Sequence, residues 1–268
     1  MILLPEEQEK KTNDGGDAII EKEGDEEDLF SRLKNKPWGP SSNPYSVEIG
    51  GGNCDVYISD ENGKININGI KDDTREGFIK FLTSLTISEI DADTITGSIL
   101  DWVDKDSLHH INGAESDYYA TLPDPYEAKN GPFETIEELA LVKGVTPKIY
   151  EMLREHVTMY GSGKINVNYA SREVLQYVPL ITPEIAEGII TLREEQGKIK
   201  EFGELKELFR SFGIVGSNFH KILDFLTVYD SNYVTINSIS SADGIQNSYK
   251  MIVLKGIQHF RIVAVYPE

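Results

Sequence analysis

Apolar and polar residues alternate in four short runs near the two ends of the chain. The first two runs, residues 45–49 and 55–59, are separated by the glycine-rich stretch 50–53, and the last two are residues 249–254 and 260–266. Alternation with β-branched residues is typical of strands, and short glycine-containing connections are typical of hairpins. The pattern predicts one hairpin near residue 50 and another at the C-terminus.

A strand-like motif occurs three times. Residues 63–68 read GKININ, residues 163–168 read GKINVN, and residues 233–237 read YVTIN as a weaker copy. Each copy alternates β-branched with polar residues, which is the period of a half-buried strand. We expect the copies at 64–68 and 233–237 to lie in one sheet with the C-terminal hairpin, with a helical insertion between them.

Capping residues mark helices between the copies. Thr146 and Thr182 precede Pro147 and Pro183, the preferred arrangement of an N-cap and the first helical residue. Further helices are expected to begin at Thr74, near Ser88, after Thr135 and at Ser171. These starts predict helix–loop–helix units of similar build between residues 72 and 229.

The fold class expected is α+β, an antiparallel sheet interrupted by a large all-helical insertion. Residues 1–28 hold eleven acids against three lysines and are expected to form an acidic tail or a truncated stem. The remaining chain divides into an α/β domain of residues 29–70 plus 231–268, a first helical subdomain of residues 71–163, and a second of residues 164–230.

The composition and net charge of the chain disfavour some classes of binding partner. The chain has 268 residues, 39% of them hydrophobic, with a formal net charge of −19. Such a charge disfavours nucleic acid and anionic membrane surfaces, which are bound through clustered Lys and Arg. Cys54 is the sole cysteine, so no internal disulfide can form.

Acidic residues are concentrated between residues 88 and 127. This stretch contains one lysine, Lys105, and ten acids: Glu89, Asp91, Asp93, Asp101, Asp104, Asp106, Glu115, Asp117, Asp124 and Glu127. These charges repel one another unless water solvates them or a cation neutralises them. A solvated surface loop and a cation site are therefore the two alternatives.

Calcium is the cation that this loop suits, because it accepts many oxygen ligands in flexible geometry. The candidate ligands are Asp101, Asp104, Asp106, Glu115 and Asp117, although their spacing is not that of an EF-hand. His109 and His110 lie among them. Adjacent histidines in extended chain point to opposite faces, so at most one would serve as a ligand, and solvated loop residues are the simpler interpretation of both.

No arrangement of catalytic residues is recognisable. Neither a Ser-His-Asp nor a Cys-His set can be proposed from spacing, and Gly161-Ser-Gly-Lys164 lacks the second glycine and the Ser or Thr of a phosphate loop. We predict that the protein is not an enzyme.

Residues 164–205 resemble the helix–hairpin–helix repeat of DNA-binding proteins. That family uses hairpin glycines to bring backbone N–H groups close to a phosphate. Here the hairpin 179–183 reads PLITP without glycine, and residues 164–210 hold seven bases against eight glutamates. We predict no nucleic-acid partner, and keep a nucleic-acid-binding module as an alternative function.

Several motifs, taken in order, resemble the K-type minor pseudopilin of the bacterial type II secretion system. They are SDENGKININ at 59–68, DWVD at 101–104, GAESDYY at 113–119, ELALVKGV at 138–145 and KINVN at 164–168. The resemblance covers roughly residues 29–266. It implies a pilin-like sheet, a structural role at the tip of the pseudopilus in export of folded proteins, and I-type and J-type minor pseudopilins as partners.

The resemblance also implies how the protein is attached to the membrane and which metal it binds. Family members carry a cleaved leader and an N-terminal membrane helix at the periplasmic face of the inner membrane, and we expect this sequence to represent the part outside the membrane. Members also bind calcium in the helical domain, which favours calcium at the acidic loop. A minor pilin of a type IV pilus is the alternative with the same fold.

Overall fold

The structure is a computed structural model that describes residues 39–41, 43–49, 51–242, 244–256 and 259–267. The predicted tail 1–28 and the first residues of the predicted α/β domain lie outside the described residues. Within the described part, no helix is long and apolar enough to cross a membrane.

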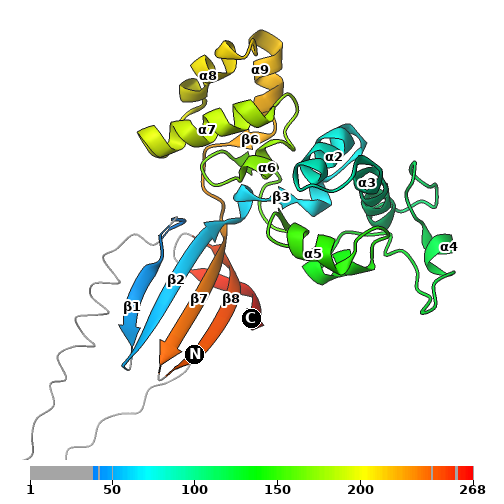
Figure 1. Cartoon of the computed structure of the whole chain (residues 1–268), viewed down its shortest axis with the longest axis horizontal. Helices are drawn as coiled ribbons and strands as arrows, with labels where there is room; N and C mark the ends of the chain where they lie inside the picture. Colours follow the sequence, from blue (N-terminus) through cyan, green and yellow to red (C-terminus); the bar gives the residue numbers. More distant parts are fainter. Residues whose placement is uncertain (1–38, 42, 50, 243, 257–258, 268) are drawn as a thin grey trace, which may run out of the picture. The chain divides into compact units, whose positions relative to one another are not determined.

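Five antiparallel strands form the main sheet, in the order β1-β2-β7-β8-β9 (Figure 1). The strands are β1 Tyr45–Ile49, β2 Gly52–Asp60, β7 Tyr233–Ala242, β8 Ile245–Lys255 and β9 Phe260–Pro267. Both predicted hairpins are confirmed, and so is the prediction that the copy at 233–237 joins the C-terminal hairpin. Neighbouring strands β2 and β7 are joined by the whole insertion.

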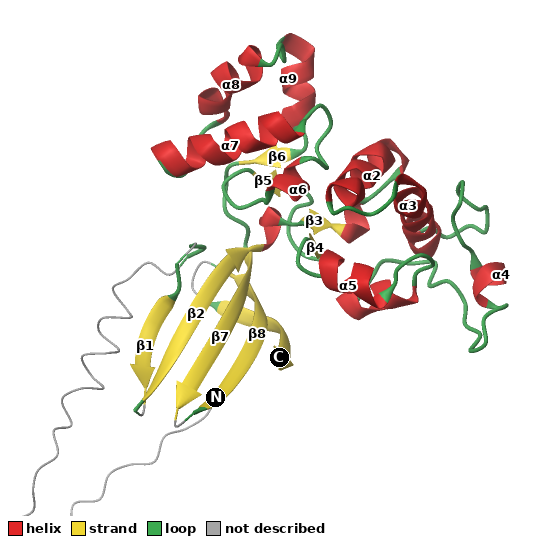
Figure 2. Ribbon diagram, in the orientation of Figure 1, coloured by secondary structure: helices red, strands yellow, loops and turns green. Residues whose placement is uncertain are grey.

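Helices make up most of the insertion between β2 and β7 (Figure 2). The α-helices are α2 Arg75–Ser84, α3 Glu89–Val103, α4 Ser116–Tyr119, α5 Pro147–Leu153, α6 Arg172–Leu175, α7 Pro183–Gln196, α8 Lys206–Ser211 and α9 Gly216–Leu223. Five short 3₁₀ helices accompany them: Glu61–Gly63, Ile67–Gly69, Asp72–Thr74, Ile136–Leu141 and Phe202–Leu205. The α+β class with a helical insertion is therefore confirmed.

The predicted N-caps hold the helix starts. The Oγ1 atoms of Thr146 and Thr182 accept hydrogen bonds from the backbone N–H groups of Ile149 (3.3 Å) and Ile185 (3.4 Å). Ser88 and Ser171 cap α3 and α6 in the same way. Each cap satisfies an N–H group that has no partner within its helix, so the local sequence sets these starts.

The prediction for the copy at 64–68 is wrong. Its residues lie outside the main sheet: β3 Ile65–Asn66 pairs in parallel with β4 Val157–Thr158. The Asn66 side chain accepts a hydrogen bond from the Asn68 backbone N–H (3.0 Å), which turns the chain into a 3₁₀ helix after two paired residues. The pair β5 Ile165–Asn166 and β6 Leu226–Thr227 is built in the same way.

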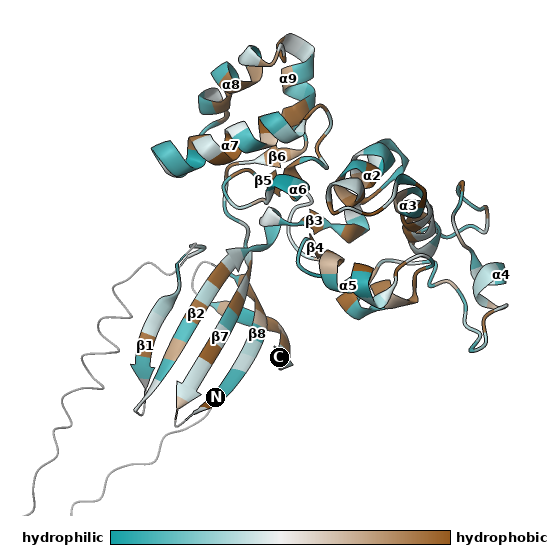
Figure 3. Ribbon diagram, viewed as in Figure 1, coloured by the Kyte–Doolittle hydropathy of each residue, from teal (hydrophilic) through white to brown (hydrophobic). Residues whose placement is uncertain are grey.

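Each parallel pair closes a module of the insertion. The first module, residues 63–162, contains α2 to α5, and the second, residues 163–230, contains α6 to α9. One apolar core runs through both, and its fully buried members include Phe78, Leu139 and Leu205. Hydrophobic residues recur at intervals along the helices and strands (Figure 3), as expected for elements with one buried face.

Two buried acids mark the point where the sheet meets the first module. Asp60 accepts hydrogen bonds from the backbone N–H groups of Asn62 (2.8 Å) and Ser231 (2.6 Å). Glu61 binds Lys64 Nζ at 2.9 Å and accepts hydrogen bonds from Thr158 and Thr235. Burial raises the pKa of Asp60 to about 6. Burial acts in the same direction on Glu61, but Lys64 and the two threonines outweigh it and lower its pKa.

Candidate metal centre

Helix α3 forms one wall of the acidic site. Ile95, Ile99 and Trp102 face the core, and Asp101 on the last turn is fully buried beside them. The C-terminal end of a helix carries partial negative charge, and no base lies in this last turn. A buried carboxylate in that position requires compensation from elsewhere.

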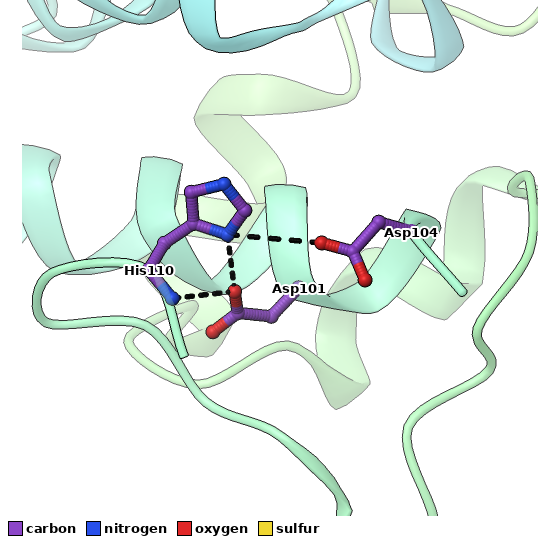
Figure 4. A group of neighbouring side chains, drawn as sticks. All are labelled: Asp101, Asp104 and His110. Atoms are coloured by element: carbon purple, nitrogen blue, oxygen red, sulfur yellow. Dashed lines mark hydrogen bonds and ion pairs between the residues drawn. The ribbon is translucent and has the colours of Figure 1, made fainter. Parts of the chain in front are cut away.

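The loop that follows folds back onto the helix through its carboxylates. Asp104 Oδ1 accepts from the Asp106 backbone N–H (3.2 Å), and Asp106 Oδ1 accepts from that of Leu108 (2.8 Å). Asp101 Oδ1 then accepts from the His110 backbone N–H at 2.9 Å (Figure 4). Three successive acids thus shape the loop and gather at the end of α3.

Two glycines allow the loop to lie close to α3. A Cβ atom on Gly113 would be 2.1 Å from Asp101 Oδ2, and a Cβ atom on Gly97 would be 2.7 Å from the Ile111 carbonyl oxygen. Real Cβ atoms do not approach other atoms so closely, so any larger residue would push the loop away from the carboxylates.

Buried carboxylate oxygens at this site have no protein partner. Within the described residues, both side-chain oxygens of Glu115 and Oδ2 of Asp101 are inaccessible to water and accept no hydrogen bond. Glu115 has 2% and Asp101 0% of its surface exposed. An unpaired buried charge is costly, and a bound cation is the usual compensation.

The acids form two overlapping groups of potential ligands. Asp101, Asp104 and His110 make one group, and Asp104, Asp106 and Glu115 make the other, with ligand atoms within 4.8 Å of one another in each. Four of the five predicted residues are thus brought together. Asp117 belongs to neither group: its side chain is 74% exposed and lies 3.0 Å from His109 Nε2.

Electrostatic effects at the site agree with an excess of negative charge. Burial, together with neighbouring carboxylates, raises the pKa of both Asp104 and Glu115. Burial alone would lower the pKa of His110, but the Asp101 hydrogen bond and the charges of Asp101, Asp72 and Asp104 raise it. A cation among these groups would relieve the repulsion.

An aromatic cluster supports the far side of the loop. Trp102 meets Tyr119 edge-on with ring centroids 5.4 Å apart, and Tyr119 stacks on Tyr126 at 5.1 Å. Lys143 donates its backbone N–H to the Tyr119 hydroxyl (3.2 Å), and its Nζ donates to the Gly113 carbonyl (3.0 Å). These contacts fix the chain on both sides of Glu115 independently of any metal.

The donor set fits calcium, since it supplies several hard oxygens on a loop that already converges. Sequence reasoning gave His110 no clear role and missed Asp72, whose Oδ1 lies 3.1 Å from His110 Nε2. Asp72 precedes the acidic stretch and lies in the 3₁₀ helix Asp72–Thr74, so the spacing of residues within the loop could not have connected it to His110.

Comparison with known proteins follows the two modules. Residues 63–162 match the family model "Type II secretion system (T2SS), protein K", and residues 161–227 match the model "Helix-hairpin-helix motif". Type II secretion system protein K of Pseudomonas aeruginosa is 27% identical over 217 residues, which are 75% of this chain and 65% of that protein. The protein of the same name from Aeromonas hydrophila is 31% identical over 130 residues, 46% of this chain and 39% of that protein.

A solved structure has the same fold. "The Crystal Structure of the GspK-GspI-GspJ complex from enterotoxigenic Escherichia coli Type 2 Secretion System" contains a chain that matches with a TM-score of 0.68 at 20% identity, covering 90% of this chain and 91% of that chain. The shared fold is an antiparallel sheet interrupted between two neighbouring strands by helical modules. The chain is therefore similar to type II secretion system protein K in the sequence of its first module, and it shares the fold of the GspK-containing structure. It spans about two fifths to two thirds of the length of the two relatives described above.

Proposed function

We propose that this protein is a structural, non-catalytic minor pseudopilin at the tip of the type II secretion pseudopilus, on the periplasmic side of the inner membrane. The observation that carries the proposal is the position of the insertion. The chain leaves the sheet after Asp60, at the end of β2, and returns at Tyr233, the start of β7. The helical insertion therefore extends from one end of these two neighbouring strands. Such an insertion suits a position where no further subunit stacks above it.

The partners proposed are the I-type and J-type minor pseudopilins of the same bacterium. The structural neighbour was solved in a complex with proteins named GspI and GspJ, and its fold is shared along 90% of this chain. Size-exclusion chromatography with light scattering of the three purified proteins should give one complex containing all three. Elution of this chain alone from a mixture in which the other two are folded would contradict the partnership.

Position at the tip calls for a separate test. Immunogold labelling of assembled pseudopili should place this protein at filament ends only, whereas labelling along the length would contradict a tip role. Deletion of the gene should stop export of folded proteins. Loss of type IV pili with export intact would instead support the minor-pilin alternative.

We propose in addition that calcium binds at the acidic loop. Asp104, Asp106 and Glu115 would hold the ion, with Asp101 contributing from α3. The support is the set of buried oxygens without a partner, described above. When bound, the ion supplies positive charge that neutralises the carboxylates, and the chain itself provides the converging loop.

The helix–hairpin–helix match makes nucleic-acid binding the second candidate, and the hairpin disfavours it. Leu180 adopts a left-handed φ of 66° in the turn before α7, and its side chain is 45% exposed. A side chain there obstructs the close backbone approach to phosphate that glycine permits. We expect no micromolar binding to duplex DNA in about 0.15 M salt, where non-specific binders still bind. A salt-dependent mobility shift would overturn this expectation.

A further inference from the structure

Helix α7 packs against α6 and α8 in the second module, and its outer face carries a shallow groove (Figure 1). The half-buried Gly188, Leu192 and Leu208 contribute the apolar part of this groove. Gly188 lets α8 approach α7, because a Cβ atom at this position would lie 2.7 Å from a methyl carbon of Leu208. The groove is also lined by three exposed glutamates: Glu184, Glu187 and Glu195. It therefore combines an apolar floor with negative charge.

The first module contains a counterpart of this face on α3. Helices α3 and α7 begin after the N-caps Ser88 and Thr182, so residues at the same distance from the two caps correspond. The fully buried Ala92 and Ala186 occupy one such pair of positions. On the outer face, the corresponding pairs are Asp93 and Glu187, Gly97 and Thr191, and Asp101 and Glu195.

An ion pair that occurs in both modules supports this correspondence. Arg75, the first residue of α2, lies 2.6 Å from Asp93, and Arg172, the first residue of α6, lies 3.6 Å from Glu187. The side chains of the first pair are 25% and 23% exposed, whereas those of the second pair are 50% and 61% exposed. The same two charges are therefore covered in the first module and open in the second.

A turn of the acidic loop, residues 110–113, covers this face in the first module. The backbone carbonyl of Ile111 accepts a hydrogen bond from Arg75 (3.4 Å), and the side chain of Asn112 donates one to Asp93 (2.7 Å). In the second module, residues 197–198 alone connect α7 to the buried residue that follows. Within the described part of the chain, no comparable loop is therefore present to cover the groove.

The residue at the centre of the face determines how closely a partner can approach. In the first module it is Gly97, where a Cβ atom would lie 2.7 Å from the Ile111 carbonyl oxygen. The corresponding Thr191 is exposed, and its side chain keeps the backbone of a partner away from the helix. Donors that reach Glu187 and Glu195 past this side chain must be longer than asparagine. Lysine and arginine meet the requirement, because their aliphatic stems can lie on apolar side chains while their charged ends bind carboxylates.

We propose that the outer face of α7 binds a loop of a partner protein that presents lysine or arginine side chains. Their stems lie on Leu192 and Leu208, their charged ends bind Glu187 and Glu195, and a backbone carbonyl of the loop accepts a hydrogen bond from Arg172. The partner takes the place on α7 that the turn 110–113 takes on α3. Phosphate does not fit this face, because the glutamates repel it.

The probe is a cyclic peptide that copies residues 108–114 with the substitutions His110→Lys and Asn112→Lys. These two positions contact the acids of α3 in the first module, so the lysines should face Glu195 and Glu187. The control peptide carries Leu108→Lys and Ile111→Lys instead, at positions that are 75% and 77% exposed in the loop. Both peptides have two added lysines, and only the first presents them towards the helix.

Nuclear magnetic resonance of the ¹⁵N-labelled full chain locates the binding. We expect the first peptide to shift amide signals of α7, the start of α6 and α8, and the control peptide to bind much more weakly. Glu187→Gln and Glu195→Gln should each weaken binding about fivefold, the upper value for an exposed ion pair. Thr191→Arg places a base in the groove and should abolish binding.

The matched control is Glu194→Gln, which removes the same charge from the neighbouring residue of α7. Glu194 is exposed and does not line the groove, so binding should stay unchanged. The positions substituted in the chain are all exposed, and the spectrum of each variant shows whether its fold is retained.

Two results would overturn the proposal. The first is equal binding of both peptides, or equal weakening by Glu194→Gln and Glu195→Gln, which would mean unspecific attraction by the net charge of −19. The second is the absence of signal shifts at about 1 mM peptide, where weak contacts are still detected. Binding that survives Thr191→Arg in a folded variant would place the peptide elsewhere and would also contradict the proposal.

Discussion

The two modules of the insertion share a framework, and one connection differs greatly in length between them. In the first module, Asn68 exchanges two hydrogen bonds with the backbone of Phe133 (2.8 and 3.0 Å), and in the second, Asn168 does the same with Ile199 (2.7 and 2.9 Å). Glu138 and Glu204 each lie in a 3₁₀ helix. The side chain of each accepts hydrogen bonds from the backbone N–H groups of the two residues that precede its helix. The connection that leads from the longest helix to the residue bound by the asparagine differs in length. It comprises residues 104–132 between α3 and Phe133 in the first module, and residues 197–198 between α7 and Ile199 in the second.

The shorter connection shows what the framework requires. Helix α7 ends at Gly197, whose left-handed φ of 82° lets the chain reach Ile199 at once. Helix α3 ends instead at Asp104 in extended conformation and begins the acidic loop. Because the second module folds without such a loop, we infer that the acids of the first serve a function other than building the module.

Removal of the asparagine clamp should have the largest effect. Asn168→Ala leaves the buried N–H and C=O groups of Ile199 without partners, and each such group costs about 1–3 kcal/mol. We expect a loss of about 4 kcal/mol in the free energy of unfolding, measured with urea, and a similar loss for Asn68→Ala. The exposed Asn247→Ala should change little. A large loss at one clamp only would show that the modules are not equivalent.

Asp60, the last residue of β2 just before the first module, should make stability depend on pH. Its pKa is about 6 in the fold against 3.8 for the ordinary group, so the fold disfavours the ionised form. The resulting cost to the free energy of unfolding is about 3 kcal/mol; it is present above pH 6 and disappears as pH falls towards 3.8. Carboxyl ¹³C NMR should therefore show Asp60 titrating near pH 6.

The corresponding stability measurement compares the unaltered protein with Asp60→Asn at several pH values. The difference in unfolding free energy should move in favour of the unaltered protein as pH falls from 7.5 to 3.5. At the equivalent point of the second module the chain has Tyr160, which stays neutral over this range. If the difference in unfolding free energy between the two proteins did not change with pH, the prediction for Asp60 would be wrong.

Calcium should stabilise the protein through the first module only. At a hundredfold excess over its Kd, one ion adds about 2.7 kcal/mol. Millimolar calcium should raise the melting temperature of metal-stripped protein, and magnesium should do so less because it tolerates irregular oxygen shells poorly. Asp104→Ala or Glu115→Ala should abolish most of the response, whereas the exposed Glu195→Ala in the second module should not. Identical melting curves with calcium and with chelator would leave a solvated loop.

The smallest effect is expected at the matched turns before α3 and α7. Thr86 and Leu180 have left-handed φ angles of 65° and 66°, which cost an L-residue about 1–2 kcal/mol. Glycine at either position should stabilise by about 0.5 kcal/mol, since its greater freedom in the unfolded chain offsets part of the gain. Calorimetry of both variants should show small shifts of the same sign. Opposite signs would mean that the two turns are not equivalent.

The sequence predicted elements wherever the signal was local. The Thr and Ser caps gave the starts of α3, α5, α6 and α7, and alternation gave the strands of the main sheet. The repeated Ile-Asn motif was misinterpreted, because alternation implies one face towards water. In the second copy Ile165, Asn166 and Val167 are all buried, and the asparagine side chains bind backbone groups far along the chain.

The acidic site was predictable to a similar extent. Clustered charge identified the loop and four residues that converge in it. Clustered charge could not show that Asp117 lies outside the group of converging acids, because the direction of a loop side chain follows from the fold. Nor could it indicate that the exposed Asp72 contacts His110, from which it is separated by 38 positions in the sequence.

Hydrogen exchange, measured by mass spectrometry on metal-stripped protein with and without calcium, tests the central claim most directly. The claim is that the acidic loop is a cation-dependent addition to the first of two matched modules. We predict that calcium slows exchange in residues 104–118 and leaves the second module, including residues 197–205, unchanged. Equal slowing in both modules, or no change in the acidic loop, would contradict the claim.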